Sequence, residues 1–179
     1  MAVQQAILRE NAHRRIKKIV DFGCGSLNFL PYLKYIYDIC EVLCVDVKDY
    51  ILHRNLSKAQ PNLKDTQDKL TKPLSISILH GSVADPDYLL IGSDVVLGIE
   101  LCVCRCMILL FIYIKHFSIE HLYPDVLEAI PYNIFGYVEP KAVILTTPNA
   151  DFNVVFPNKR AFRNIDHKFE WSRDQFESW

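Results

Sequence analysis

The sequence has almost no excess of charge of either sign. Its 179 residues carry a formal net charge of −1 at pH 7, so no global basic field predicts nucleic-acid binding, and such a site would have to be a local patch. The apolar run 106–114 is too short to cross a bilayer. The first residues are polar and basic without an apolar centre, which is not the pattern of a signal peptide. We therefore expect a cytoplasmic protein that makes no membrane contact.

Cysteine spacings that would indicate a disulfide framework or a zinc site are also missing. The chain has six cysteines. Those between residues 24 and 44 lie inside apolar runs, where buried free thiols are expected. Cys102, Cys104 and Cys106 alternate with other residues, whereas zinc sites use wider spacings and a second ligand pair elsewhere. Metal binding by these three cysteines is the minor alternative.

Apolar runs of strand length alternate with segments of helical pattern. Strands are predicted at 17–25, 40–47, 74–83, 93–100 and 141–149. Helices are predicted at 26–39, with Pro31 in the first turns, and at 125–138, and a further helix can precede Pro61. This order predicts an α/β domain over residues 1–179, with a mostly parallel sheet and helices on both faces. Ligands of such sheets bind at the carboxyl ends of the strands.

A glycine turn follows the first predicted strand, in the order Asp21, Gly23 and Gly25. Two glycines let the backbone turn sharply and approach a ligand closely. The dinucleotide fingerprint needs a third glycine at position 28, where this chain has Asn28. An acidic residue before the glycines also suits a pyrophosphate poorly, because phosphate groups favour positive charge. The turn is better suited to a cationic ligand.

Two further strand ends agree with this interpretation. Asp46 ends the second strand, where a carboxylate can accept hydrogen bonds from ribose hydroxyls. The third strand ends at His80-Gly81, and Ser82 and Val83 follow where an adenine is often flanked. The combination is typical of methyltransferases that use S-adenosylmethionine (SAM) and have a Rossmann-like fold. The alternative is an ordinary tight turn with two solvated aspartates.

A candidate metal site appears when residues 102–118 are left out. Glu100 then stands three residues before Glu120 and four before His121, a spacing that places all three side chains on one helix face. Two carboxylates and an imidazole suit Mg²⁺ or Mn²⁺. His167 offers a second imidazole. Taken singly, Glu120 and His121 could be polar residues at the start of a helix, and His167 could be a surface histidine.

Five short stretches carry a family resemblance that extends from about Ile19 to Trp179. They are DFGCG (21–25), HGSV (80–83), the separated pair IEL (99–101) and IEHL (119–122), TTPNADFN (146–153) and DHKFEW (166–171). With them the chain resembles the small-RNA 3′-terminal 2′-O-methyltransferases, of the animal type that acts on Piwi-associated RNAs. The metal-binding and catalytic positions of that family match Glu100, Glu120, His121 and His167.

The resemblance implies a substrate, a mechanism and partners. The metal of the family contacts both hydroxyls of the terminal ribose, which restricts methylation of the 2′ oxygen to free 3′ ends of single-stranded small RNA. A Piwi-type Argonaute protein is an implied partner, RNA granules are a narrower alternative location, and a monomer is expected. Basic residues around the last motif could contact RNA phosphates; they are Lys159, Arg160, Arg163 and Lys168.

Residues 102–118 depart from the family pattern, because the flanking motif joins without them. A translated retained intron would explain them, and this hypothesis fails if every transcript contains their codons. A continuous helix through the segment would put Glu100 and Glu120 about 30 Å apart and split the metal site. A loop whose ends stay close would preserve it, at a closure cost of about 2–3 kcal/mol.

Both ends also look clipped relative to the family: more chain is expected before Lys17 and two further strands after Trp179. Two functions therefore remain as alternatives to an active RNA methyltransferase. One is an inactive relative that still binds SAM or RNA ends. The other is a SAM-dependent methyltransferase with a substrate other than RNA.

Overall fold

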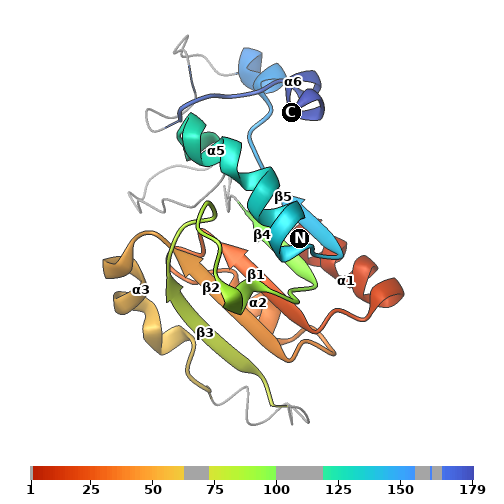
Figure 1. Ribbon diagram of the computed structural model, residues 1–179, viewed down its shortest axis with the longest axis vertical. Helices are drawn as coiled ribbons and strands as arrows, with labels where there is room; N and C mark the ends of the chain where they lie inside the picture. Colours follow the sequence, from red (N-terminus) through yellow and green to blue (C-terminus); the bar gives the residue numbers. More distant parts are fainter. Residues whose placement is uncertain (1, 63–72, 100–118, 156–161, 163–166) are drawn as a thin grey trace.

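Five parallel strands form the centre of the computed structural model, which describes residues 2–62, 73–99, 119–155, 162 and 167–179. The strands lie in the order β3-β2-β1-β4-β5 (Figure 1). Their bounds are β1 Lys18–Phe22, β2 Glu41–Asp46, β3 Ser75–His80, β4 Val95–Gly98 and β5 Ala142–Leu145. Each lies within a strand predicted from the sequence, and the mostly parallel α/β sheet is confirmed.

Register brings the carboxyl ends of the strands to one edge of the sheet. Asp46 at the end of β2 pairs with His80 at the end of β3, and Phe22 at the end of β1 pairs with both Val45 and Gly98. Because all neighbouring strands run parallel, the loops that follow them leave from that edge. Predicted ligand-binding residues from separate parts of the chain are therefore neighbours.

Helices cover both faces of the sheet, because successive strand residues point to opposite sides. Ile19 and Val42 belong to one apolar core, which also receives side chains of α1 (Ala2–Arg14), α2 (Leu30–Lys34) and α3 (Asp49–Asn55). Val20 and Leu43 belong to the other core, under α5 (Pro124–Pro131) and the π-helical turns Tyr132–Val138. Each fully buried Val, Leu or Ile side chain contributes about 1.5–3 kcal/mol.

Short elements and one more helix complete the described part. The 3-10 turns are η1 Leu56–Lys58, η2 Tyr88–Leu90, η3 Ile119–His121 and η5 Ala150–Val155, and the last helix is α6 Arg173–Ser178. Ser172 begins α6 with a reciprocal capping box to Gln175. In Figure 1 the C-terminal segment with α6 (dark blue) lies beyond α5, far from β3. None of the described helices has the length and apolar character needed to cross a membrane.

The helix predicted at 26–39 is much shorter than expected. Only Leu30–Lys34 is α-helical, with Pro31 in the first turn as predicted. Leu27 and Asp38 both have positive φ, 55° and 75°, a conformation that a right-handed helix excludes. The prediction of a continuous helix over this segment was wrong, because apolar spacing does not reveal backbone turns of this kind.

The segment predicted as a helix at 125–138 is helical but changes type part-way. The α-helix ends at Pro131, and wider π-helical turns continue from Tyr132 to Val138. Pro131 has no amide hydrogen, so one α-helical hydrogen bond is missing where the wider turns begin. The last turn closes through a bond from the Glu139 amide to the carbonyl of Ile134.

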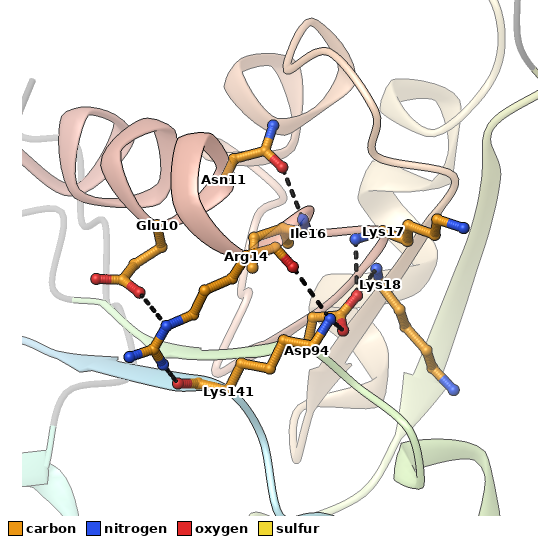
Figure 2. Close-up of polar contacts among 8 residues, drawn as sticks. All are labelled: Glu10, Asn11, Arg14, Ile16, Lys17, Lys18, Asp94 and Lys141. Carbon is orange, nitrogen blue, oxygen red and sulfur yellow. Dashed lines mark hydrogen bonds and ion pairs between the residues drawn. The ribbon is translucent and has the colours of Figure 1, made fainter.

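The carboxylate of Asp94, the residue before β4, links the amino ends of β1, β4 and β5 to α1 (Figure 2). The Oδ2 atom of Asp94 accepts hydrogen bonds from the amides of Lys17 (2.7 Å) and Lys18 (3.0 Å). Its Oδ1 atom lies 2.7 Å from the ammonium of Lys141, before β5. The same ammonium donates to the carbonyl of Arg14 at the end of α1, and the Arg14 guanidinium donates back to the Lys141 carbonyl.

These contacts lower the pKa of Asp94. Desolvation by burial alone would raise it, but the hydrogen bond from Lys141 and those from the two backbone amides outweigh the desolvation. An acid whose pKa is lower when folded stabilises the fold above its unfolded pKa. That stabilisation disappears as the pH falls through the folded pKa.

We predict that Asp94→Asn destabilises the protein by about 2 kcal/mol near neutral pH, because a charged acceptor shared by three donors is lost. The measurement is urea unfolding followed by circular dichroism. The difference between variant and wild type should shrink as the pH falls below the ordinary aspartate pKa. Glu41→Gln is the control, since Glu41 only approaches Lys18 at 3.8 Å and is half-exposed; an equal loss there would contradict a special role of Asp94.

Candidate active site

The ends of β1, β2 and β3 are held together around Asp46. Its Oδ2 atom accepts a hydrogen bond from the amide of Gly25, and its Oδ1 atom accepts one from the amide of Lys48, both at 2.8 Å. Its carbonyl accepts the Gly81 amide at 3.1 Å. Asp46 therefore shapes the glycine turn, and its carboxylate oxygens retain lone pairs for further donors such as ribose hydroxyls.

The glycine turn needs backbone conformations that other residues adopt rarely. Gly23 and Gly25 have φ values of 69° and 49°. The amides of Gly23 and Cys24 both point to the carbonyl of Val45, at 2.7 Å and 3.2 Å. These bonds fix the turn against β2 and leave Asp21, one residue before the end of β1, beside Asp46.

Asp21 is a buried carboxyl with an unusual pKa. Desolvation by burial, reinforced by the nearby charge of Asp46, raises its pKa from 3.8 to about 7. A cationic group next to Asp21 would favour the ionised carboxylate and lower that pKa again. The pair of acidic groups therefore suits a positively charged ligand, as the sequence predicted, and would repel a phosphate.

The loop after β3 carries Ser82 and Val83, the other predicted cofactor residues. Val83 is buried, and the Ser82 hydroxyl accepts a hydrogen bond from the Ala84 amide at 3.1 Å. The side-chain amide of Asn133, on the π-helical turns, donates to the Val83 carbonyl. Sequence reasoning missed this anchor, because Asn133 stands fifty residues away in a pattern that predicted only a helix.

A second cluster brings together three predicted metal ligands. The Oε1 atom of Glu120 lies 4.0 Å from Nε2 of His121 and 3.8 Å from Nε2 of His167. The two imidazole rings meet edge to face with centroids 4.9 Å apart. Glu120 has no exposed surface, and His167 is 6% exposed. The structure thus brings together three of the four residues that were predicted as metal ligands; that they bind a metal stays a prediction.

Main-chain contacts explain how His167 reaches Glu120 across the sequence. The amide of Lys168 donates to the carbonyl of Glu120 at 2.7 Å, and the amide of Ala150 donates to that of Trp171 at 2.9 Å. These bonds lay the 167–171 segment against both η3 and η5. A fully buried carboxylate such as Glu120 is costly unless polar partners surround it, and these bonds bring such partners close.

The cluster has the donor set of a divalent cation site. One ligand atom from each of Glu120, His121 and His167 lies within 4.8 Å of the others, and one oxygen with two imidazole nitrogens suits Mn²⁺ and accepts Mg²⁺. The fourth predicted ligand, Glu100, lies outside the described residues. So do residues 102–118 and the predicted phosphate contacts Lys159, Arg160 and Arg163.

Sequence reasoning assigned no role to three polar residues behind this cluster. Thr147 donates to Glu120 at 3.1 Å, Glu170 contacts His167 at 2.5 Å, and Asn153 donates to Glu170 at 2.6 Å. All three belong to the stretches 146–153 and 166–171 that carry the family resemblance. That location was the one signal in the sequence that could have indicated them.

Comparison with known proteins decides the family. No protein-family model matches the chain. A small RNA 2′-O-methyltransferase of Drosophila melanogaster is 41% identical over 172 residues, which cover 92% of this chain. The chain belongs to the small-RNA 2′-O-methyltransferase family. It spans 39% of the length of that Drosophila relative.

Solved structures agree with this membership. The methyltransferase domain of bacterial CtHen1-C aligns with a TM-score of 0.70 and 26% identity, over 99% of this chain and 78% of that domain. The small RNA methyltransferase HEN1 aligns with a TM-score of 0.71 and 26% identity, over 99% of this chain and 20% of its own. The fold is the Rossmann-like fold of SAM-dependent methyltransferases.

We predict that Asp21→Asn stabilises the protein at about pH 8 by an amount on the order of a few kcal/mol. Wild-type Asp21 must ionise in a buried site as the pH rises through about 7, so folding loses stability between the unfolded and the folded pKa, and the amide avoids this loss. Thermal unfolding measured across pH should show the gain vanish below the unfolded pKa. A gain that is independent of pH would contradict the assignment.

We predict that Glu120→Gln and His167→Ala each weaken Mn²⁺ binding strongly. The loss should exceed the roughly 10–100-fold that is typical when a residue hydrogen-bonded to a metal ligand is mutated. Each variant removes one of three converging ligand atoms. The measurement is isothermal titration calorimetry with Mn²⁺ and no other ligand. His80→Ala is the control, because His80 is exposed and its ring contacts the Val47 carbonyl at 3.2 Å, away from the cluster. Unchanged affinity in Glu120→Gln would exclude the cluster as the metal site.

Proposed function

We propose that this chain transfers a methyl group from SAM to the 2′ oxygen of the 3′-terminal ribose of small single-stranded RNA, with the help of Mg²⁺ or Mn²⁺. The observation that carries the proposal is the convergence of Glu120, His121 and His167 in a chain that belongs to a family of small-RNA 2′-O-methyltransferases. The relatives are longer, so the activity of this chain alone is part of the proposal.

The carboxyl ends of β1 to β3 are the proposed binding place of SAM. Gly23 and Gly25 let the main chain approach the cofactor closely. The buried carboxyl of Asp21 lies near the proposed place of the cationic half of the molecule, which would favour its ionised form, and Asp46 offers acceptors to the ribose hydroxyls. Ser82 and Val83, in the loop after β3, mark the proposed place of the adenine. SAM would supply the methyl group from its sulfonium, and the C–S bond would break to release the neutral thioether S-adenosylhomocysteine.

The metal cluster is the proposed binding place of the RNA end. A divalent cation held by Glu120, His121 and His167 would lower the pKa of a ribose hydroxyl and orient it. Glu120 is wholly buried, so a cation bound to it would lie away from bulk water. We infer that both hydroxyls of the terminal ribose are needed to complete the coordination.

Lys168 and Tyr123 extend the proposed RNA site beyond the metal cluster. Lys168 follows His167 in the chain and is exposed, and its ammonium lies 4.7 Å from the centroid of the Tyr123 ring. Tyr123 is 61% exposed. An exposed cation beside an exposed ring suits a nucleotide, because the ammonium can contact a phosphate and the ring can stack on a base. A Piwi-type Argonaute protein is the proposed source of the RNA.

The test is methyl transfer from labelled SAM to small RNAs that differ only at their 3′ ends. We expect transfer to an end with both hydroxyls, and little or none to a 3′-deoxy end or a 2′-O-methylated end, because one metal must hold two oxygens. Activity should require Mn²⁺ or Mg²⁺. Glu120→Gln should abolish transfer, and Glu128→Gln, which changes an exposed carboxylate on α5, should not.

Other outcomes identify the alternatives. Equal transfer to the 3′-deoxy end would contradict the metal mechanism. Binding of SAM or RNA without any transfer would indicate an inactive relative, and transfer to a substrate other than RNA would indicate a different methyltransferase.

Lys168→Ala should raise the KM for RNA about tenfold, the effect of losing about 1.4 kcal/mol, with kcat little changed.

A further inference from the structure

His167 lies between two carboxylates, one on each side of its ring. Its Nε2 atom is 3.8 Å from Oε1 of Glu120, on the side of the metal cluster. Its Nδ1 atom is 2.5 Å from Oε1 of Glu170, on the opposite side. The side chains of His167 and Glu170 are 3% and 1% exposed, so water does not compete for this contact. The orientation of the ring is set by Glu170.

The contact with Glu170 also selects the tautomer of His167. A carboxylate only accepts hydrogen bonds, so the imidazole nitrogen that faces it carries the hydrogen. The neutral ring then has Nδ1–H toward Glu170 and the lone pair of Nε2 toward Glu120. Only the nitrogen with the lone pair can bind a metal ion, and this arrangement directs it into the cluster.

One segment of the chain holds both carboxylates by their outer oxygens. Thr147 donates from its hydroxyl to Oε2 of Glu120 at 3.1 Å, and Asn153 donates from its side-chain amide to Oε2 of Glu170 at 2.6 Å. In each carboxylate the other oxygen, Oε1, is the one that faces His167. Residues 147 and 153 thus lock the two groups on either side of the ring.

We propose that Glu170 is a positioning residue of the metal site, that Asn153 acts through it, and that Thr147 acts separately through Glu120. This inference rests on the proposed metal site and deepens it. Glu170 also places a second buried negative charge on the far side of the ring, which favours a cation at Nε2. It is not itself a ligand, because its near oxygen is engaged by Nδ1 and the converging ligand atoms come from other residues.

Two substitutions of Glu170 separate its hydrogen bond from its charge. Glu170→Gln keeps an oxygen that can accept from Nδ1 and removes the charge. Glu170→Met has a similar length and removes the acceptor as well. We expect Mn²⁺ affinity to fall in the order wild type, Gln, Met, with a loss of about 10–100-fold for Met. Calorimetry measures it on the full chain without SAM or RNA, and Glu177→Gln, an exposed carboxylate on α6, is the control.

The tautomer of His167 provides a readout that a merely structural role would not change. Nitrogen-15 NMR of the metal-free protein, recorded on the neutral form of the ring, should find the hydrogen of His167 on Nδ1. It should move to Nε2 in Glu170→Met. A wild-type ring with its hydrogen on Nε2, or a Met variant that binds Mn²⁺ within about twofold of wild type, would overturn the proposal. The proposal would also be overturned if Glu170→Met lost thermal stability to an extent that accounts for its whole loss of Mn²⁺ affinity.

Combined variants test the two proposed routes. Asn153→Ala should weaken Mn²⁺ binding in the wild type and have no further effect in Glu170→Met, because its partner is already gone. Thr147→Val should weaken binding to the same extent in both backgrounds; a Thr147 effect that vanishes with Glu170 would refute separate routes. These measurements use no RNA. A chain that shows this pattern but methylates no RNA would therefore contradict the proposed function and leave the positioning role intact.

Discussion

A carboxylate with no exposed surface, at Glu120, is the constraint around which this half of the molecule is arranged. Burying such a charge is costly unless polar or cationic groups compensate it. The compensation comes from three separate segments: the imidazole of His121 beside it, the hydroxyl of Thr147 after β5, and the ring of His167 near the C-terminus. A divalent cation at this point would complete the compensation, which is the physical reason to regard the cluster as a metal site.

At the ends of β1 and β2, two acidic side chains are placed close to each other. They belong to Asp21 and Asp46. Burial of Asp21 and the charge of Asp46 raise the pKa of Asp21 to about 7. The amides of Gly25 and Lys48 donate hydrogen bonds to the carboxylate of Asp46 and stabilise it. The ionised form of Asp21 would be stabilised by a cation placed beside it. The Asp21–Asp46 pair and the Glu120 cluster therefore each offer carboxyl groups that suit a positively charged ligand. In the proposed function, a sulfonium donor and a divalent cation that binds the ribose would meet these two requirements.

Particular elements show how far the sequence could be read. The five strands could be predicted because four of them are largely apolar runs and β3 alternates apolar with polar residues, and the glycine turn could be predicted because Gly23 and Gly25 stand directly after β1. The helix at 26–39 could not, since the positive φ of Leu27 leaves no trace in apolar spacing. Asn133 and Glu170 were missed for another reason: a single polar residue shows nothing of its partner until the chain is folded.

By itself the sequence determined the parallel sheet, the sheet edge at which ligands are expected and the residue types available for a cation, because apolar periodicity and strand ends are local properties. Only the tertiary structure decided which of those residues meet. Glu120 and His167 come together through one main-chain bond from Lys168, and the orientation of His167 depends on Glu170 and Asn153. Contacts of this kind follow from the packing of distant segments against each other, and no spacing along the chain encodes their geometry.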